Sequence, residues 1–204
     1  MKNKEEKIDF MLKEAFKLFL RKEYADVTTG DLEEAIGISR GSIYYRTKNK
    51  EGLYKAVIDK FVFDFLSSEV DNGIDVDKKV PFYSFLCIYL EKINKRMSKI
   101  KTNIKTLNIS YQYVNLFSSA CSHYPKFQEK YKDVEELIIA QWNRYYLLGI
   151  ETGELRKGQD MKTVIAMFRS MYHGDSFIQS IVGGGLNLHE LKNKYMLLYD
   201  CIKV

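Results

Sequence analysis

The sequence predicts an all-α protein. Through most of its 204 residues, apolar side chains recur at intervals of three and four, the spacing that places them on one face of a helix. No stretch sustains the alternation of a half-buried strand, and the chain contains only two prolines. Turn-forming residues divide the periodic segments into an N-terminal group of short helices and a C-terminal group of long ones.

The first helix is expected over residues 4–22, with an apolar stripe formed by Ile8, Met11, Leu12, Ala15, Leu18 and Phe19. The second helix follows Thr28, whose hydroxyl is expected to cap it, and Asp31 is expected to complete a capping box. Its buried face is predicted to consist of Leu32, Ala35 and Ile36.

A glycine turn separates the second helix from a short third helix. Gly37 supplies the positive φ that ends a helix without steric cost, and Ile38 is expected to fill the corner. Ser39 is predicted to cap the third helix, with Ile43 facing the core. A helix, a tight turn and a second helix in this order are typical of a helix-turn-helix unit, which places its second helix in the DNA major groove.

The remaining helices are longer. Asn49 is expected to cap a fourth helix over residues 50–69, with one face formed by Leu53, Val57, Phe61 and Phe65. Residues 71–77 form the most turn-like segment and a plausible boundary between two parts of the chain. Further helices are predicted over residues 81–101, 125–151, 161–181 and 188–202, whereas residues 103–121 give mixed signals.

Residues 40–50 contain four basic side chains and no acid, a net charge of +4 within a chain of net charge +5. Such a group is often only a solvated loop, but here it coincides with the third helix and therefore indicates a surface that faces phosphates. Arg40 and Ser42 are predicted to contact base edges, since arginine bonds guanine with two donors. The predicted DNA-contacting residues are Thr28, Ser39, Arg40, Gly41, Ser42, Tyr44, Tyr45, Lys48 and Lys50.

The other predicted contacts concern the DNA backbone. Thr28, at a helix N-terminus, and the backbone N–H of Gly41 are expected to donate to phosphates, and Gly41 lets the backbone approach because it has no Cβ. Tyr44 and Tyr45 point about 100° apart on a helix of 3.6 residues per turn. One of them is expected to touch DNA while the other packs against the protein or bonds a second phosphate.

Residues 8–57 resemble the DNA-binding region of the TetR/AcrR family of bacterial transcriptional regulators. The matching positions are Ile8, Ala15, Leu18, Phe19, Tyr24, Val27-Thr28, Asp31-Leu32, Ala35, Gly37 to Tyr45 and Lys50-Glu51-Gly52-Leu53. The chain departs from the family pattern at Glu23, where glycine is usual, at Gly30 in the first turn of the second helix, and at Arg46-Thr47, which replaces His-Phe.

The resemblance implies a helix-turn-helix DNA-binding domain in residues 1–48 and a helical ligand-binding and dimerisation domain in residues 49–204. It implies a repressor that binds palindromic double-stranded operator DNA as a homodimer and is released by a small apolar or aromatic effector. Two recognition helices about 34–36 Å apart read a palindrome, which calls for a dimer. An activator, or a regulator without an effector, remains an alternative.

Two sets of C-terminal residues follow from these expectations. Aromatic side chains with polar tips suit a ligand pocket, although packing in the core is the simpler interpretation for any single one. The candidate pocket residues are Tyr83, Tyr89, Tyr111, Phe117, His123, Trp142, Tyr145, Phe168 and Tyr172. The candidate dimer interface, on the last two helices, comprises Val164, Phe168, Met171, Phe177, Ile178, Leu188, Leu191, Tyr195 and Leu198.

Other classes of protein find little support in the sequence. Motifs for catalysis, metal binding or phosphate binding are missing, so no catalytic residue, metal or cofactor is predicted. Cys87, Cys121 and Cys201 are expected as small core residues in a reducing compartment. Neither a signal peptide nor an apolar run of about 20 residues is present, which predicts a cytoplasmic protein without a membrane partner. The alternative function is a helical small-molecule-binding or interaction protein with a degenerate DNA-binding head.

Overall fold

The computed structural model describes residues 4–68, 70, 73–103, 109–183 and 185–204. The regular elements among the described residues are helices. Leu155 and Lys203 also form an isolated antiparallel β-bridge. The chain divides into two compact units, which are described separately. Unit 1 comprises residues 1–67 and 112–132, and unit 2 comprises residues 68–111 and 133–204. Residues 49–67 and 112–132 thus group with the N-terminal helices, while the predicted domain boundary after residue 48 stays a prediction.

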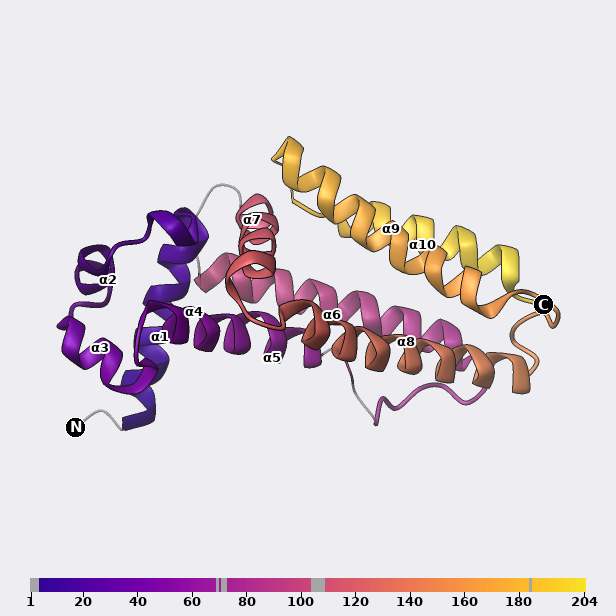
Figure 1. Ribbon diagram of the computed structural model, residues 1–204. Coiled ribbons are helices and arrows are strands. Elements are labelled where there is room, and N and C mark those ends of the chain that lie inside the picture. The colour runs from indigo at the N-terminus through magenta and orange to yellow at the C-terminus, as the bar shows by residue number, and fades with distance from the viewer. Residues whose placement is uncertain (1–3, 69, 71–72, 104–108, 184) are drawn as a thin grey trace. The chain divides into compact units, whose positions relative to one another are not determined.

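Unit 1 contains the N-terminal helices (Figure 1). They are α1 (Lys4–Arg21), η1 (Tyr24–Asp26), α2 (Thr29–Ile36), α3 (Arg40–Thr47), α4 (Lys50–Ile58), η2 (Asp59–Phe63) and α5 (Asp64–Ser67). Most of α7 (Ile109–His123) and the start of α8 (Phe127–Glu151) complete the unit. Fully buried side chains from α2, α3 and α4 form part of the core, among them Leu32, Ile43 and Leu53.

The fourth helix departs from the expected single run over residues 50–69. Asn49 caps α4 as predicted, by accepting the backbone N–H of Gly52 at 2.8 Å. Residues 59–63 then form a π-helical turn, which inserts one residue relative to the α-helical period. The buried positions therefore move to Val62 and Phe63, and the predicted face residues Phe61 and Phe65 are only half-buried.

Three smaller expectations are wrong. Ala35 is exposed, so the buried face of α2 is formed by Leu32 and Ile36 alone. Ile38 does not fill the corner after Gly37, because 39% of its surface remains exposed. Cys121 and Cys201 lie at the surface and Cys87 is half-buried, so none is a fully buried core residue. Each error concerns a small or isolated apolar residue, whose burial depends on neighbours distant in sequence.

Unit 2 contains the long helices α6 (Pro81–Asn103), α9 (Met161–Val182) and α10 (Leu188–Ile202), together with most of α8. Their bounds agree with the predicted ones within two residues. The buried carboxylate of Glu154 joins the two ends of the unit. It accepts the backbone N–H groups of Phe82 and Tyr83 at 2.8 and 2.7 Å, and the hydroxyl of Tyr199 at 3.0 Å. The start of α6 is thereby held against α10, on which it packs.

Residues 103–121, which gave mixed signals, lie largely in α7, and positions 104–108 fall outside the described residues. Positions 71 and 72 of the predicted boundary and Gly184 fall outside them as well. Among the described helices, none combines the length and the apolar character needed to cross a bilayer.

Candidate nucleic-acid interface

The second helix begins with the predicted capping box. The hydroxyl of Thr28 accepts the backbone N–H of Asp31 at 3.1 Å, and the carboxylate of Asp31 accepts the backbone N–H of Thr28 at 2.8 Å. Lys22 also donates to Asp31, at 2.7 Å. The hydroxyl of Thr28 donates to the same carboxylate at 2.8 Å. Lys22 first, and then the backbone N–H and the hydroxyl of Thr28, lower the pKa of Asp31 to about 2. The start of α2 is thus fixed by local groups before any partner binds.

The turn and the third helix are held differently. Gly37 adopts the predicted left-handed conformation, with φ of 75°. Ser39 occupies the cap position of α3, but its hydroxyl caps nothing and lies 3.2 Å from the hydroxyl of Ser42. The predicted cap is wrong because Glu33, on α2, supplies the acceptor. Its carboxylate accepts the backbone N–H of Arg40 at 2.6 Å, a placement that also suits the helix dipole.

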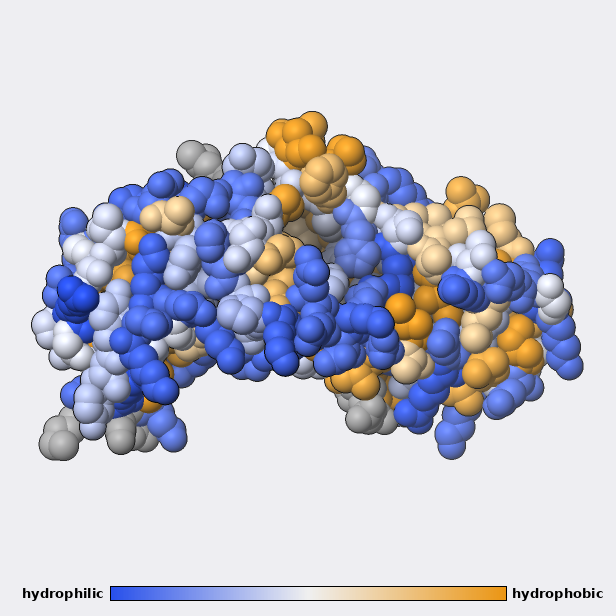
Figure 2. All heavy atoms as spheres, in the orientation of Figure 1, coloured by the Kyte–Doolittle hydropathy of each residue, from blue (hydrophilic) through white to orange (hydrophobic). Residues whose placement is uncertain are grey.

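The outer face of α3 is polar and open to solvent. Tyr45 is 87% exposed, and Arg40, Ser42 and Arg46 are exposed beside it. Tyr44 is half-buried, and the guanidinium of Arg40 lies 6.0 Å from its ring centroid. Figure 2 shows a largely hydrophilic surface over this part of unit 1. The fully buried Ile43 packs into the core on the opposite side of the helix, which fixes the orientation of the exposed face.

Two glycines near the interface meet opposite surroundings. A Cβ on Gly52 would lie 1.9 Å from the carbonyl oxygen of Thr47, so the close approach of α3 to α4 requires glycine there. A Cβ on Gly41 would meet nothing within 4 Å. Glycine costs a helix about 0.5–1 kcal/mol relative to alanine. The surroundings within the protein do not require that cost at Gly41.

The two lysines after α3 are placed differently from each other. Lys48 is exposed and ends α3 with φ of 68°. Lys50 is half-buried, and its ammonium donates to the backbone carbonyls of Tyr24 and Val27, at 2.7 Å each. Burial lowers the pKa of Lys50. Lys50 therefore ties α4 to the connection between α1 and α2, a role not evident from its position in the sequence.

The candidate ligand-pocket residues are divided between the two units. Phe117 and His123 belong to unit 1, and the others belong to unit 2. Tyr89, Trp142, Tyr145 and Phe168 are buried. The rings of Tyr89 and Phe168 pack on Trp142, and Phe85 joins Trp142 to Tyr145, with centroids 4.6–5.7 Å apart. Tyr83 and Tyr111 are 38% and 48% exposed, and Tyr172 packs on Tyr89 at 6.2 Å. A ligand pocket lined by these nine residues stays a prediction.

The candidate interface residues on α9 and α10 differ in how far they are buried. Val164, Phe168, Leu191, Tyr195 and Leu198 are buried within unit 2, so their assignment to a dimer interface is corrected. Met171 and Leu188 are half-buried. Phe177 and Ile178 are 50% and 55% exposed and continue into Ile181 and Val182, at 61% and 67%. Figure 2 shows hydrophobic side chains gathered over this end of α9.

Three residues of the candidate nucleic-acid interface make structural contacts that the sequence did not predict. Glu33, Gly52 and Lys50 act through contacts between helices, and their sequence neighbourhoods show only a helical acid, a helical glycine and a surface lysine. Gly37 forms the predicted left-handed turn, whereas the DNA contacts expected from the charge run over residues 40–50 stay a prediction.

Comparisons with known proteins agree with this geometry. The family pattern described as "Bacterial regulatory proteins, tetR family" matches residues 11–57. The IcaR protein of Staphylococcus epidermidis, a negative transcriptional regulator of the biofilm operon icaADBC, is 26% identical over 101 residues. That match covers 48% of this chain and 53% of IcaR, so it spans about half the length of that relative.

Solved structures show the same fold over nearly the whole chain. A TetR transcription regulator from Haloarcula marismortui superposes with a TM-score of 0.73 at 16% identity, covering 98% of this chain and all of that one. The structure of a SmeT–triclosan complex gives a TM-score of 0.62 at 17% identity, covering 96% of this chain and 88% of that one. At these identities the likeness establishes the fold.

Proposed function

Because the chain belongs to the TetR family of bacterial regulatory proteins, we propose that it represses transcription as a homodimer that binds palindromic operator DNA through α3. The observation that carries the proposal is the outer face of α3, where Arg40, Ser42, Tyr45 and Arg46 are exposed above the buried Ile43. A polar, basic helix face fixed by one apolar anchor is what insertion into a major groove requires.

The contacts proposed for this face follow the predicted set. Arg40 and Ser42 reach base edges, and Tyr45 reaches a phosphate or a thymine methyl group because it is almost fully exposed. Thr28, Ser39, Lys48 and the backbone N–H of Gly41 hold phosphates. Tyr44 supports Arg40 through its ring. Lys50 remains a predicted phosphate contact, to which the structure adds its two intramolecular carbonyl acceptors.

The homodimer is proposed to form through the exposed face of α9. Ala166, Ser170 and Gly174 are exposed at helical spacing ahead of Phe177, Ile178 and Ile181. A Cβ on Gly174 would meet nothing in the protein within 4 Å. Small residues followed by large apolar ones allow two copies of this helix to approach closely and exclude water, as a self-complementary interface requires.

An effector site is proposed in the interior of unit 2. Among the described residues, the indole N–H of Trp142 and the hydroxyl of Tyr195 are buried without a hydrogen-bond partner, and their ring centroids lie 6.4 Å apart. An unsatisfied buried donor costs about 1–3 kcal/mol. An apolar or aromatic molecule with an acceptor atom recovers that cost, and the related SmeT fold binds the aromatic compound triclosan.

The mechanism proposed for release is a shift between two populations of the dimer, one with its α3 helices at operator spacing and one without. An effector drives the shift only if it binds the second population more tightly. Its affinity must therefore fall when operator DNA is present. Equal effector affinities with and without operator would refute this mechanism.

Selection of binding sites from a random DNA pool tests the function directly. The expected product is a palindrome whose half-sites are centred about one helical turn, 34–36 Å, or a multiple of it apart. The spacing and symmetry of the selected sites would report the dimer as well as the sequence. Failure to enrich any sequence would favour the alternative of an interaction protein with a degenerate DNA-binding head.

A further inference from the structure

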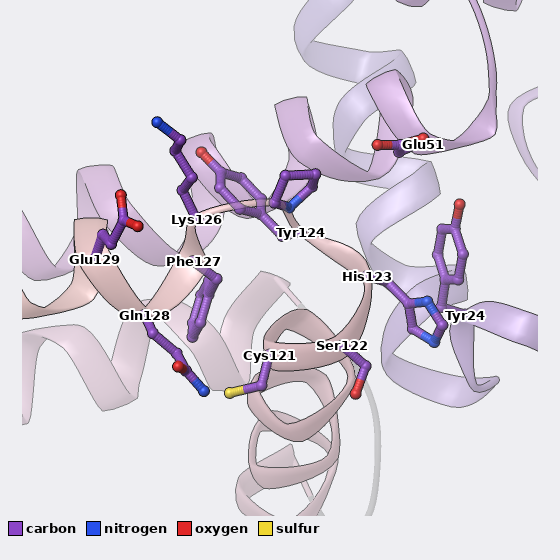
Figure 3. A pocket seen from close by; sticks show the side chains of 11 residues that line it. Tyr24, Glu51, Cys121, Ser122, His123, Tyr124, Lys126, Phe127, Gln128 and Glu129 are labelled. Carbon is purple, nitrogen blue, oxygen red and sulfur yellow. The ribbon is translucent and has the colours of Figure 1, made fainter.

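A pocket of about 550 Å³ lies within unit 1, at the turn between α7 and α8 (Figure 3). Tyr24, from the connection between α1 and α2, and Glu51, from the first turn of α4, form one side of it. His123, Tyr124 and Glu129 come from the end of α7, the turn and the start of α8. Its volume falls in the range of about 300–1,000 Å³ that small-molecule sites occupy. Only His123 of these residues was expected to line a pocket.

Aromatic faces in and around the pocket are already used to hold cations. The rings of Tyr24 and His123 stack, with centroids 4.4 Å apart and planes inclined by 27°. The ammonium of Lys50 lies 4.3 Å from the centroid of Tyr24, and that of Lys55 lies 5.7 Å from the centroid of Tyr124. Both distances lie within the approximately 6 Å at which a cation is attracted to a ring face.

The charges that line the pocket are mostly negative. Glu51 and Glu129 are exposed, and neither carboxylate has an ion-pair partner among the residues that the structure describes. Lys126 is the one cation in the lining, and Figure 3 shows its side chain extending away from Tyr24 and Glu51. Burial, and then the charge of Glu51, raise the pKa of the Tyr24 phenol, which indicates that the Glu51 carboxylate acts at that end of the pocket.

We propose that this pocket binds a small organic cation, an amine or a quaternary ammonium attached to a flat apolar group. The flat group lies against the stacked rings of Tyr24 and His123, and the positive charge faces the carboxylate of Glu51. Carboxylates and aromatic faces both attract a cation, whereas an anion of the same shape is repelled by the carboxylates of Glu51 and Glu129.

The bound cation affects the proposed DNA-binding domain, residues 1–48, which is called the head below and belongs to the same unit. The carbonyl of Tyr24 accepts the ammonium of Lys50, and Lys50 opens α4 directly after the turn that ends α3. On the other side of the pocket, the hydroxyl of Tyr124 donates to Asp59 at 2.8 Å, at the start of the π-helical turn. A ligand that contacts both tyrosines holds the α1–α2 connection and the α7–α8 turn together, so it stabilises unit 1.

Titration calorimetry of the full chain without DNA tests this proposal, with benzyltrimethylammonium as the probe. We expect saturable binding of the probe, no binding of benzenesulfonate, and affinity that falls as salt is raised, because charges at an open site are screened. Since no DNA is present, failure of this site and failure of the proposed regulator function are distinguishable. An absence of saturable binding, or binding of benzenesulfonate at least as tight, overturns the proposal.

Variants locate the site. Glu51→Gln removes the charge and keeps the shape, and we expect it to weaken the probe about fivefold, as for a partly exposed ion pair. Glu34→Gln, at an exposed acid on α2 outside the pocket, serves as the matched control and should leave the affinity unchanged. His123→Ala should also weaken the probe, independently of any effect of Glu51 on α4. If Glu51→Gln and His123→Ala have no effect while Trp142→Phe abolishes binding, the probe occupies the interior of unit 2 and the proposal is wrong.

Discussion

The outer faces of α3 and α9 are both exposed, yet they are built from opposite kinds of side chain. Arginine, serine and tyrosine cover the α3 face, whereas Phe177, Ile178 and Ile181 cover the α9 face. A surface that must leave its partner repeatedly gains from polar and charged contacts, which set orientation and are weakened by salt. A surface meant for lasting association gains from burying apolar area. This difference suits the partners proposed above, a releasable one for α3 and a permanent one for α9.

The largest effect is expected from a variant that destabilises the packing of α3 on α4 and leaves the exposed face of α9 unchanged. Gly52→Ala places a Cβ 1.9 Å from the carbonyl oxygen of Thr47, and we expect it to destabilise the head by about 3 kcal/mol or more, through steric overlap that backbone atoms cannot relieve. Thermal unfolding should show early loss of the head, and sedimentation should still show a dimer.

Gly41→Ala is the matched control for Gly52→Ala, because its Cβ meets open space. Its stability should be unchanged or higher by up to about 1 kcal/mol, while its affinity for DNA falls. Equal unfolding temperatures for the two variants would show that the α3–α4 approach is not as close as described.

The converse variant removes the α9 face and spares the head. Ile178→Arg buries a charge in the proposed interface, so we expect a monomer in sedimentation and a loss of operator affinity of about a hundredfold or more, since the two heads no longer bind as one. Leu137→Arg on α8 is the control, because Leu137 and Ile178 are both 55% exposed. A dimer that survives Ile178→Arg but not Leu137→Arg would move the interface to α8.

A smaller effect should separate base contacts from support of the head. Arg40→Ala is expected to weaken operator binding about tenfold or more, with less effect on random DNA, because a bidentate contact to guanine discriminates by about 1–3 kcal/mol. Lys50→Ala should weaken both DNAs alike. It should also lower the unfolding temperature, because two carbonyls lose their donor. Gel-shift titrations at several salt concentrations measure both, and equal losses on the two DNAs for Arg40→Ala would make Arg40 a phosphate contact.

The smallest effect concerns the pH dependence of the α2 cap. The pKa of Asp31 in the folded chain, about 2, lies below its ordinary value of 3.8. Its contribution to stability is therefore complete above about pH 4 and is lost as the pH falls toward 2. The unfolding temperature of Asp31→Asn should lie below that of the wild type at pH 5, and the difference should shrink by pH 2. A constant difference would mean that the carboxylate charge does not act in the cap.

The sequence predicted what depends on near neighbours. The capping box of Thr28 and Asp31, the glycine at residue 37 and the bounds of the long helices follow from residues within one turn of each other. The Glu33 cap on α3 could not be predicted, since its partner Arg40 lies on another helix. The exposed side of α9 could not be predicted either, because that helix is apolar on two faces. Packing against Tyr195 and its neighbours determines which of the two faces is buried.

The π-helical turn over Asp59–Phe63 has a consequence for how this chain is compared with its relatives. A turn of this kind is one residue longer than the α-helical turn it replaces, as if a single codon had been inserted into an uninterrupted helix. Relatives with an ordinary helix here should therefore align with a one-position gap. Deleting Lys60 should therefore restore the regular α-helical period, while Val62 and Phe63 keep their buried positions.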